Sequence, residues 1–362
     1  MRKALFITNS ISFGGASKML CFVAESLAAR GYEVVIVNLR ATEDVTEYER
    51  TVAGVEVITL DEVPNGKNRH VYRISKIREA AQQKHSDVVI GFTSFPNIYA
   101  SMVGKFLHIP SVISERGDPN RTIGNSLKDK IATFIINRSS GGVFQTDGAK
   151  AFFGNGLQKR GIVIPNPIFI KDEIPMIPFA QREKTVVSVG RLDNEQKRLD
   201  IMLESFSIFS KTHPEYILKL YGRGTQEAEI KQWCINLGIK DKVKFMGLTT
   251  QPMQDIAHDG MFLITSDYEG ISNSLLEAMA VGLPCVSTDH TPGGARLLIQ
   301  DHENGLLAPI EYAEAIARAM CEFADNSDLA EKCGNNAREV VNRFNPNRII
   351  DLWEEYLNSI CM

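Results

Sequence analysis

Two glutamates, Glu269 and Glu277, stand on either side of a short run of small and polar residues. The run, 270–274, reads GISNS and leads into the apolar segment LLEAMAV, which predicts a helix that begins after Ser274. An ionised glutamate accepts hydrogen bonds from adjacent hydroxyl groups, and the amides at a helix start attract phosphate or sugar oxygens. The stretch therefore predicts a site for a phosphorylated ligand rich in hydroxyl groups. The simpler alternative is a helix cap in which Ser274 and Glu277 form a capping box.

Two cations follow the predicted strand TVVSV. Arg191 comes directly after Gly190, and Lys197 lies six residues further along the chain. The arginine fork and the lysine point charge together can neutralise a diphosphate. A charged surface loop would explain either cation alone. Cations and glutamates that follow strands of one sheet indicate an anionic ligand more strongly than any of them alone.

A pair of glycines, Gly14 and Gly15, separates the predicted strand ALFITN from the first predicted helix. Bare backbone at this place lets a ligand approach closely, although a tight structural turn is an equal alternative. The second predicted strand ends in Arg40 and the pair is not GxGxxG, which disfavours a nicotinamide dehydrogenase. The motifs DxD, GxxxxGK[ST] and GxSxG do not occur in the sequence. Their absence disfavours a metal-bridging aspartate pair, a P-loop enzyme and an α/β-hydrolase.

The cysteine and histidine spacing does not predict a metal site. The six cysteines are scattered without CxxC spacing, which favours a reducing compartment over a disulfide framework. Asp289-His290 and Asp301-His302 are interpreted as polar loop residues. The apolar stretch at the N-terminus is too short for a signal peptide, and no segment has the length of a membrane span. We therefore expect a soluble cytoplasmic protein.

Short β-rich runs alternate with helix-length amphipathic segments along the whole chain. This alternation predicts parallel sheets that are covered by helices on both faces. Four prolines interrupt the rhythm between residues 163 and 184, so the chain is expected to form two doubly wound, Rossmann-like α/β domains. We place the first domain at 1–165, the linker at 166–184 and the second domain at 185–344. Ligands of such folds bind at the carboxyl ends of the strands, here in a central cleft that the two domains would face.

The charge of the chain is unevenly distributed. Residues 1–180 hold 22 Lys and Arg against 17 Asp and Glu, and the remainder holds 18 against 27. The first half therefore carries a net charge of +5 and the second half −9, so the first half alone suits an anionic surface. A basic stretch at 67–85 concentrates this charge, although a solvated helix face is the simpler explanation.

Taken together, these stretches resemble the family-4 retaining glycosyltransferases of GT-B architecture. The resemblance covers essentially the whole chain and rests on an ordered set of motifs. These are the Gly-Gly loop, VFQTDGAK, VIPNPI, GRLDNEQKRLD, LYGRG, VKFMG, EGISNSLLE and the C-terminal PNRIIDLWEEYL. By this resemblance, a helix at 345–362 crosses back onto the first domain, which would bind the acceptor, while the second domain would bind a nucleotide sugar.

The resemblance implies a role for each matching residue. Arg191 and Lys197 would hold the diphosphate of the donor, Glu269 would bind its sugar hydroxyls, and Glu277 would bind its ribose. The remaining donor-binding positions would contribute backbone; they are Gly14, Gly15, Gly190, Gly270, Ile271, Ser272, Asn273 and Ser274. Transfer would retain the anomeric configuration and require neither a metal nor a cofactor, with UDP as the expected nucleotide and a hexose or N-acetylhexosamine as the sugar.

The acceptor side is expected in the first domain. Many members of the family carry a His in the loop where this chain reads ISERGDPN, and we place Glu115, Arg116 and Asp118 there on the acceptor side. A local ion pair that braces the loop is the alternative. The resemblance to enzymes of bacterial surface-polysaccharide assembly, such as lipopolysaccharide and O-antigen, implies a polyprenyl-diphosphate-linked saccharide as acceptor, at the cytoplasmic face of the membrane.

The segment 126–138 places four apolar residues on one side, with basic residues nearby. The apolar residues are Leu127, Ile131, Phe134 and Ile135, and the basic residues are Lys128, Lys130 and Arg138. Such a basic amphipathic stretch suits the surface of an anionic membrane. Burial as an ordinary core helix is the more common outcome for such a pattern.

Four other functions compete with this one. The same transfer could use a soluble acceptor, and a nucleotide-sugar epimerase has a similar two-domain architecture. A hydrolase would use Glu269 and Glu277 as its carboxylate pair, but it would have no diphosphate for Arg191 and Lys197 to neutralise. A non-catalytic saccharide- or nucleotide-binding protein is the fourth, and the intact charged residues argue against it.

Overall fold

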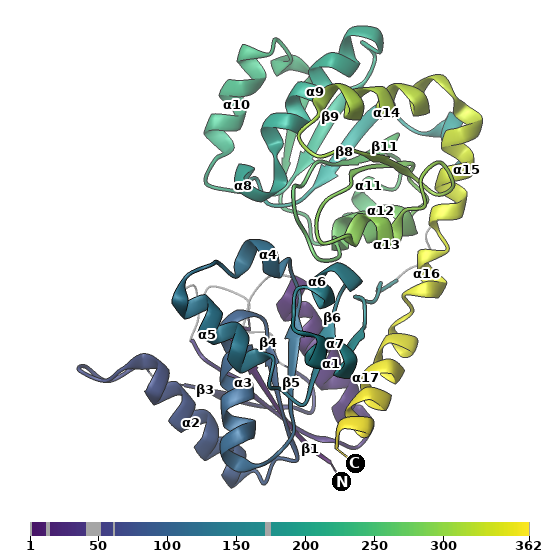
Figure 1. Cartoon of the computed structure of the whole chain (residues 1–362). Coiled ribbons are helices and arrows are strands. Elements are labelled where there is room, and N and C mark those ends of the chain that lie inside the picture. The colour runs from purple at the N-terminus through teal and green to yellow at the C-terminus, as the bar shows by residue number, and fades with distance from the viewer. Residues whose placement is uncertain (1, 12–14, 41–51, 61, 171–174, 362) are drawn as a thin grey trace. The chain divides into compact units, whose positions relative to one another are not determined.

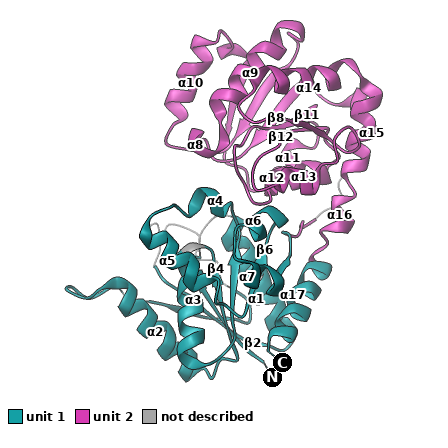
Figure 2. Ribbon diagram, in the orientation of Figure 1, with its two compact units in different colours: residues 1–166, 347–362 teal, residues 167–346 magenta. Residues whose placement is uncertain are grey.

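The computed structural model describes residues 2–11, 15–40, 52–60, 62–170 and 175–361. The chain divides into two compact units, coloured separately in Figure 2. Unit 1 comprises 1–166 and 347–362, and unit 2 comprises 167–346.

Unit 1 is built on a seven-stranded parallel sheet in the order β3-β2-β1-β4-β5-β6-β7 (Figure 1). Its strands are β1 (Lys3–Thr8), β2 (Glu33–Asn38), β3 (Glu56–Thr59), β4 (Val88–Phe92), β5 (Ser111–Glu115), β6 (Gly141–Phe144) and β7 (Gly161–Val163). Its helices are α1 (Gly15–Ala29), α2 (Arg69–Gln83), α3 (Ser94–Leu107), α4 (Pro119–Thr122), α5 (Leu127–Ile136), α6 (Asp147–Ala151), α7 (Asn155–Arg160) and α17 (Pro346–Ile360).

Successive residues of β1 enter different cores because side chains of a strand alternate between the two faces of the sheet. Phe6 packs with residues of α1 and α17, whereas Leu5 and Ile7 pack with residues of α2 and α3. Helix α17, from the end of the chain, is bound firmly in unit 1. Its Trp353 is fully buried and stacks on Phe92 at 6.1 Å between ring centroids.

Unit 2 is built on a six-stranded parallel sheet in the order β10-β9-β8-β11-β12-β13. Its strands are β8 (Thr185–Val189), β9 (Ile217–Tyr221), β10 (Val243–Gly247), β11 (Met261–Ile264), β12 (Cys285–Thr288) and β13 (Leu306–Ala308). Its α-helices are α8 (Asn194–Lys197), α9 (Leu199–Thr212), α10 (Glu227–Asn236), α11 (Pro252–Ile256), α12 (Asn273–Ala280), α13 (Gly294–Leu298), α14 (Ala313–Asp325), α15 (Ser327–Ala337) and α16 (Val340–Arg343). Two 3₁₀ turns, η1 (Phe179–Gln181) and η2 (Lys240–Lys242), complete it.

Both sheets reverse their strand order next to their first strand. In unit 2 the reversal lies between β8 and β11. The neighbour of β8 on its other side is β9. The loops that leave β8 and β11 run in opposite directions from such a point, which opens a crevice for a ligand at the carboxyl ends of the strands. The predicted fold class, two doubly wound parallel α/β domains, is confirmed.

Candidate functional site

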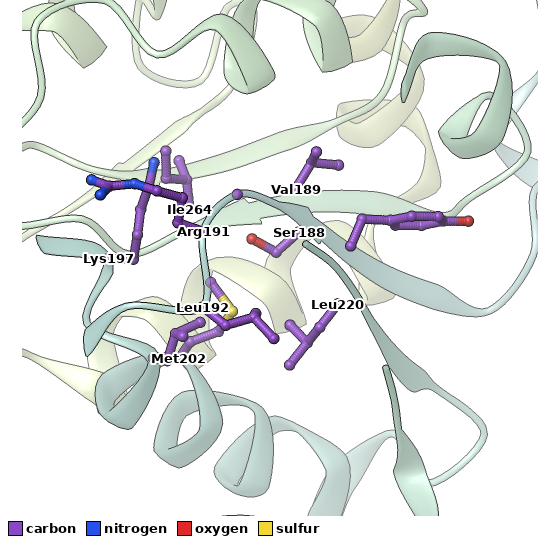
Figure 3. Close-up of a pocket in the computed structure, with 11 residues that line it drawn as sticks. Ser188, Val189, Arg191, Leu192, Lys197, Met202, Leu220 and Ile264 are labelled. Atoms are coloured by element: carbon purple, nitrogen blue, oxygen red, sulfur yellow. The ribbon is translucent and has the colours of Figure 1, made fainter. Parts of the chain in front are cut away.

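The predicted cations and Glu269 lie at the reversal point of the unit 2 sheet. Arg191 follows β8, Lys197 ends the short helix α8, and Glu269 follows β11. Figure 3 shows Arg191 and Lys197 among the residues that line a small pocket here. The rest of the lining is largely apolar and comes from β8, β9, β11 and α9. Sequence reasoning therefore placed these three charged residues in one crevice of the fold.

Lys197 and Glu269 form a direct ion pair, although sequence reasoning gave them separate roles. The Lys197 Nζ donates to Glu269 Oε1, and their side chains are only 16% and 9% exposed. The Ser266 hydroxyl also donates to Glu269 Oε1, at 2.7 Å. Burial by itself raises the pKa of Glu269, but the positive charge of Lys197 and these hydrogen bonds outweigh it and lower the pKa to about 2. The carboxylate is therefore ionised at neutral pH and able to accept hydrogen bonds from a ligand.

The third charged residue of the site, Arg191, is the solvent-exposed one, because its side chain is 68% exposed. Its Nη2 donates to Gln196 Oε1 at 2.9 Å, and Asp193 lies 3.6 Å from Nη1. These contacts are solvent-accessible and weak, so an incoming anion can displace them with little loss of free energy. Arg191 is thus available to a ligand, whereas Lys197 is already held in place.

Two residues that sequence reasoning missed hold the β8 and β11 loops together. The side-chain Nε2 of Gln196 donates to the Tyr268 backbone carbonyl at 2.9 Å. The backbone carbonyl of Gln196 accepts from the Asp267 amide at 3.0 Å. Arg198 pairs with Asp267 at 3.0 Å. Their polar types in a charged loop gave no signal that distinguished them from a solvated surface. Their contacts fix the distance between the Lys197 and Glu269 backbones.

The glycines of the LYGRG motif shape the Arg191 loop from the neighbouring strand. A Cβ added to Gly222 would lie 1.8 Å from the Gly190 carbonyl oxygen, and one added to Gly224 would lie 2.0 Å from the Leu192 carbonyl oxygen. Any side chain at either position would displace the loop that carries Arg191. The motif was part of the family resemblance, and the structure supplies its physical reason.

The run 270–274 is better packed than the sequence suggested. Ile271 is 6% exposed and belongs to the core cluster of α12, and Gly270 and Ser272 are also buried. Helix α12 begins at Asn273, and its N-cap is Ser272, whose hydroxyl accepts from the Leu275 amide at 3.4 Å. The expected start after Ser274 was therefore wrong.

The capping box considered for Ser274 and Glu277 is excluded by this helix start. With Ser272 as N-cap, Glu277 lies beyond the third helical position and cannot reach back to the cap. The Glu277 side chain is partly exposed on α12. Its role toward a ribose stays a prediction, as do the roles of Asn273 and Ser274, which are also partly exposed.

His290 is a buried residue beside the ion pair that sequence reasoning took for a loop residue. It is 1% exposed, and neither ring nitrogen has a hydrogen-bond partner among the described residues. Burial lowers the pKa of His290, although the neighbouring Glu269 carboxylate acts in the opposite direction. Thr291, the residue after His290, contacts the Glu269 backbone directly. Its carbonyl accepts a hydrogen bond from the Glu269 amide at 2.8 Å. The neighbouring Asp289 instead pairs with Arg296.

Gly294 is expected to be intolerant of substitution because it touches the Glu269 loop. A Cβ at Gly294 would lie 1.6 Å from the Gly270 carbonyl oxygen and 3.2 Å from His290 Cε1. Gly294→Ala must therefore displace the backbone next to Glu269, and a misplacement of about 1 Å can cost about 10²-fold in rate. The measurement is the initial rate of the sugar transfer that the family resemblance implies. Gly156→Ala in α7 is the control, because a Cβ there meets only the flexible end of Arg160. A Gly294→Ala rate within twofold of wild type would contradict this role.

The predicted acceptor-side residues are buried at the end of β5 in unit 1. Glu115 Oε1 accepts from the amides of Arg116 and Gly117 at 3.0 and 3.2 Å. Asp118 is the N-cap of α4 and accepts from the Asn120 amide at 3.0 Å. Burial raises the pKa of Glu115. These contacts brace the loop, and binding of an acceptor stays a prediction.

Arg116 is a cation held inside unit 1. Its Nη2 donates to Asn166 Oδ1 at 2.5 Å, and its guanidinium lies 5.7 Å from the centre of the Phe92 ring. Burial lowers the pKa of Arg116 to about 9. The Asn166 oxygen also accepts from Gln145 at 2.8 Å, so the arginine is part of a polar network at the ends of β4, β5 and β6.

Of the predicted glycine pair, Gly14 lies outside the described residues, and Gly15 is exposed at the start of α1. Their closure over the donor stays a prediction. Among the described residues there is no group of three or more His, Cys, Asp or Glu side chains placed to hold a metal ion.

Two family models match the chain one after the other. The model described as Glycosyltransferase Family 4 matches residues 13–171, and the model described as Glycosyl transferases group 1 matches residues 170–340. The chain is 24% identical to a glycosyltransferase of Haemophilus influenzae, over 97% of this chain and 98% of the relative. It is also 24% identical, over 99% of both chains, to a Campylobacter jejuni α-1,4-N-acetyl-D-galactosaminyltransferase that acts on a PP-undecaprenol-linked saccharide.

Solved structures of other proteins superpose on nearly the whole chain. Anabaena Alr3699/HepE, solved in complex with UDP and glucose, superposes with a TM-score of 0.84 at 21% identity, over 99% of this chain and 100% of that chain. The apo form of the lipopolysaccharide outer core galactosyltransferase WaaB gives a TM-score of 0.80 at 19% identity, with 99% of each chain covered. These likenesses confirm the GT-B fold. The two models cover residues 13–340 between them, so the chain is a glycosyltransferase with a Glycosyltransferase Family 4 domain in its first half and a Glycosyl transferases group 1 domain in its second half.

Proposed function

We propose that this glycosyltransferase moves a hexose or N-acetylhexosamine from a UDP-sugar to a lipid-linked oligosaccharide, with retention of anomeric configuration. The observation that carries the proposal is the Lys197–Glu269 pair beside the exposed Arg191 at the reversal point of the unit 2 sheet. A cation, an ionised carboxylate and a second cation match a diphosphate joined to a sugar. UDP is favoured because the Anabaena relative was solved with UDP-glucose.

The chemistry follows from the charge that the reaction creates. Breaking the bond between the sugar and the diphosphate leaves negative charge on the departing phosphate oxygens. Lys197 and Arg191 would stabilise this charge, and Lys197 is preorganised for it because Glu269 already holds its ammonium group. Glu269 would position the sugar through its hydroxyl groups and is not a nucleophile. With two cations at the leaving group, transfer would require neither a metal nor a cofactor.

The lipid-linked acceptor is proposed from the relatives. The Campylobacter jejuni enzyme acts on a PP-undecaprenol-linked saccharide, and an Escherichia coli lipopolysaccharide 1,6-galactosyltransferase is 31% identical over 42% of this chain. No helix of the described residues is long and apolar enough to cross a membrane. From the relatives' acceptors, the enzyme would meet its acceptor as a peripheral protein at the cytoplasmic face of the cell membrane, in polysaccharide biosynthesis.

The test is a transfer reaction with EDTA present. The protein would be incubated with UDP-sugars and a short-chain polyprenyl-diphosphate-linked saccharide, and the product would be identified by mass, with its anomeric configuration determined by NMR. The expected product is one sugar longer and has the donor's configuration. Transfer only to a soluble saccharide would replace the lipid-linked acceptor, and a changed sugar nucleotide without acceptor would identify an epimerase. Inverted configuration or a strict need for a divalent metal would contradict the mechanism.

A further inference from the structure

Helix α5 exposes apolar side chains that a core helix would bury. Leu127 is 74% exposed, Ile131 52% and Phe134 57%. Ile136 is the one buried residue of this helix. The helix lies against α3 in unit 1 (Figure 1), so the contacts that hold it leave these side chains outside. The expectation that burial is the common outcome for this segment was wrong.

The three exposed residues form one stripe. They are spaced i, i+4 and i+7, and each step along an α-helix turns by about 100°, so they lie within about 60° of one another around the axis. By the same rotation, the buried Ile136 lies on the opposite side of the helix, about 180° from Leu127. The stripe therefore faces directly away from the body of unit 1.

Cations border this stripe on both sides. Lys128 lies about 100° from Leu127 in one direction and Lys130 about 60° in the other, and both are exposed. Beyond the end of the helix, the Arg138 guanidinium stacks 3.3 Å from the centre of the Phe134 ring. Residues 121–138 contain four Lys and Arg against one Asp, which is Asp129.

Helix α5 is capped by its own residues, so it forms without a bound partner molecule. The Ser126 hydroxyl accepts from the Asp129 amide at 3.2 Å, and the Asp129 carboxylate accepts from the Ser126 amide at 3.0 Å, which completes a capping box. Asp129 is thereby engaged at the helix start and lies about 200° around the axis from Leu127, away from the stripe. The outward surface thus combines apolar side chains with positive charge and lacks an acidic side chain from its own helix.

We propose that the α5 stripe, defined as Leu127, Ile131 and Phe134 with the flanking Lys128 and Lys130, docks on an anionic lipid membrane. Apolar side chains of an interfacial helix enter the boundary between headgroups and acyl chains, while bordering lysines reach the lipid phosphates. Each lysine near an anionic surface adds attraction equivalent to about fivefold in binding. A soluble protein partner would need an apolar surface with acidic groups on both sides of it. An anionic bilayer offers apolar acyl chains bordered by anionic headgroups over its whole surface.

This inference deepens the proposed function and rests on it for its setting, because it names the surface through which a peripheral enzyme would meet the membrane, but its test is independent of sugar transfer. Docking would place the enzyme where a lipid-linked acceptor is confined, but binding to vesicles needs neither donor nor acceptor. Loss of vesicle binding would leave the transfer proposal standing. A lack of transfer in solution would likewise leave the docking proposal standing.

The experiment is co-sedimentation of the full chain with vesicles of phosphatidylcholine containing phosphatidylglycerol, compared with phosphatidylcholine alone. Wild type is expected to bind the anionic vesicles and to lose most of that binding in high salt. The Leu127→Ser/Ile131→Ser/Phe134→Ser variant should bind more than about tenfold more weakly. Lys128→Gln/Lys130→Gln should weaken binding by about 25-fold. Ile235→Ser in α10, which removes a 49% exposed apolar residue of unit 2, and Lys240→Gln are the matched controls.

Two results would overturn the proposal. One is wild type that does not bind anionic vesicles, and the other is a triple variant that binds them as wild type does. Because the lysine variant leaves every apolar residue in place, it tests the same surface if the serine variant does not fold. Sedimentation velocity of the free protein adds a further check. Suppose that wild type is a dimer, that the triple variant is a monomer, and that wild type does not bind vesicles. The stripe would then be assigned to contact with a second copy of the chain instead.

Discussion

Lys197→Ala is expected to lower kcat/KM for sugar transfer by about 10²–10³-fold, the loss seen when one preorganised group is removed from a developing negative charge. The reason is position: Lys197 lies at the reversal point of the unit 2 sheet and is only 16% exposed, so its charge is weakly screened. Arg191 cannot replace it, because that side chain is 68% exposed and strongly solvated.

Steady-state kinetics with a saturating acceptor would measure the effect. The control is Lys231→Ala, which removes a lysine that pairs with Glu227 on the surface of α10. That variant should transfer sugar at the wild-type rate. A Lys197→Ala enzyme that keeps kcat/KM within threefold of wild type would show that the leaving group is stabilised elsewhere.

Lys197→Met is also expected to reduce the free energy of unfolding by about 3–5 kcal/mol at pH 7, because it leaves a buried carboxylate without its partner. Glu269 is 9% exposed at its side chain, and the Ser266 hydroxyl that remains provides a hydrogen bond but no charge. Glu269→Gln in the same background should restore much of the lost stability, since a neutral amide costs far less to bury. Urea unfolding of both variants would measure this. Lys76→Met, which breaks an exposed pair with Glu79, should change stability by less than about 1 kcal/mol.

The pH dependence of this deficit follows from the pKa of Glu269. In the wild type the pKa is lowered from 4.5 to about 2, so Glu269 stabilises the fold above pH 4.5 and loses that contribution as the pH falls from 4.5 to 2. Without Lys197, burial raises the pKa of Glu269, and the carboxyl group becomes protonated as the pH falls. The difference in stability between wild type and Lys197→Met should therefore shrink on acidification. A difference that is constant between pH 7 and pH 4 would show that the deficit does not come from the unpaired carboxylate.

The positions of Arg191, Lys197 and Glu269 at one crevice could be predicted because strand periodicity and chain order determine where a loop leaves a parallel sheet. Each of these residues follows a recognisable apolar strand, and the carboxyl ends of parallel strands lie at one edge. The direct contact between Lys197 and Glu269 could not be predicted in this way. It depends on side-chain directions set by Gln196 and Arg198, which look like ordinary surface residues in the sequence.

The misplaced start of α12 has a local cause. Both Ser272 and Ser274 can cap a helix, and the sequence favoured Ser274 because Glu277 completes a capping box with it. In the folded unit Ile271 is buried in the core beside Leu275, and this packing sets the helix start two residues earlier. Tertiary packing overrode the local signal.

Helix α5 and His290 show a second reason why sequence reasoning falls short. The pattern of α5 predicted an apolar side that included Leu127, Ile131 and Phe134, but Ile135 is not in the exposed stripe, and a pattern does not say whether an apolar side faces the core or the solvent. Likewise, a histidine that follows an aspartate after a strand looks like a surface residue. His290 is nevertheless 1% exposed, and a Cβ at Gly294 would lie only 3.2 Å from its Cε1 atom.

Arg191, Lys197 and Glu269 are proposed to form the binding site for the diphosphate and sugar of the donor. The most direct test of this proposal is the thermal stabilisation of the purified protein by UDP-, GDP- and ADP-sugars with EDTA present. A donor at a hundred times its Kd should stabilise the fold by about 2.7 kcal/mol, which is readily measured as a rise in Tm. We expect a rise in Tm with a UDP-sugar that persists in EDTA and is lost in Arg191→Ala but kept in Lys231→Ala. An unchanged rise in Arg191→Ala, or no rise with any sugar nucleotide, would contradict the proposal.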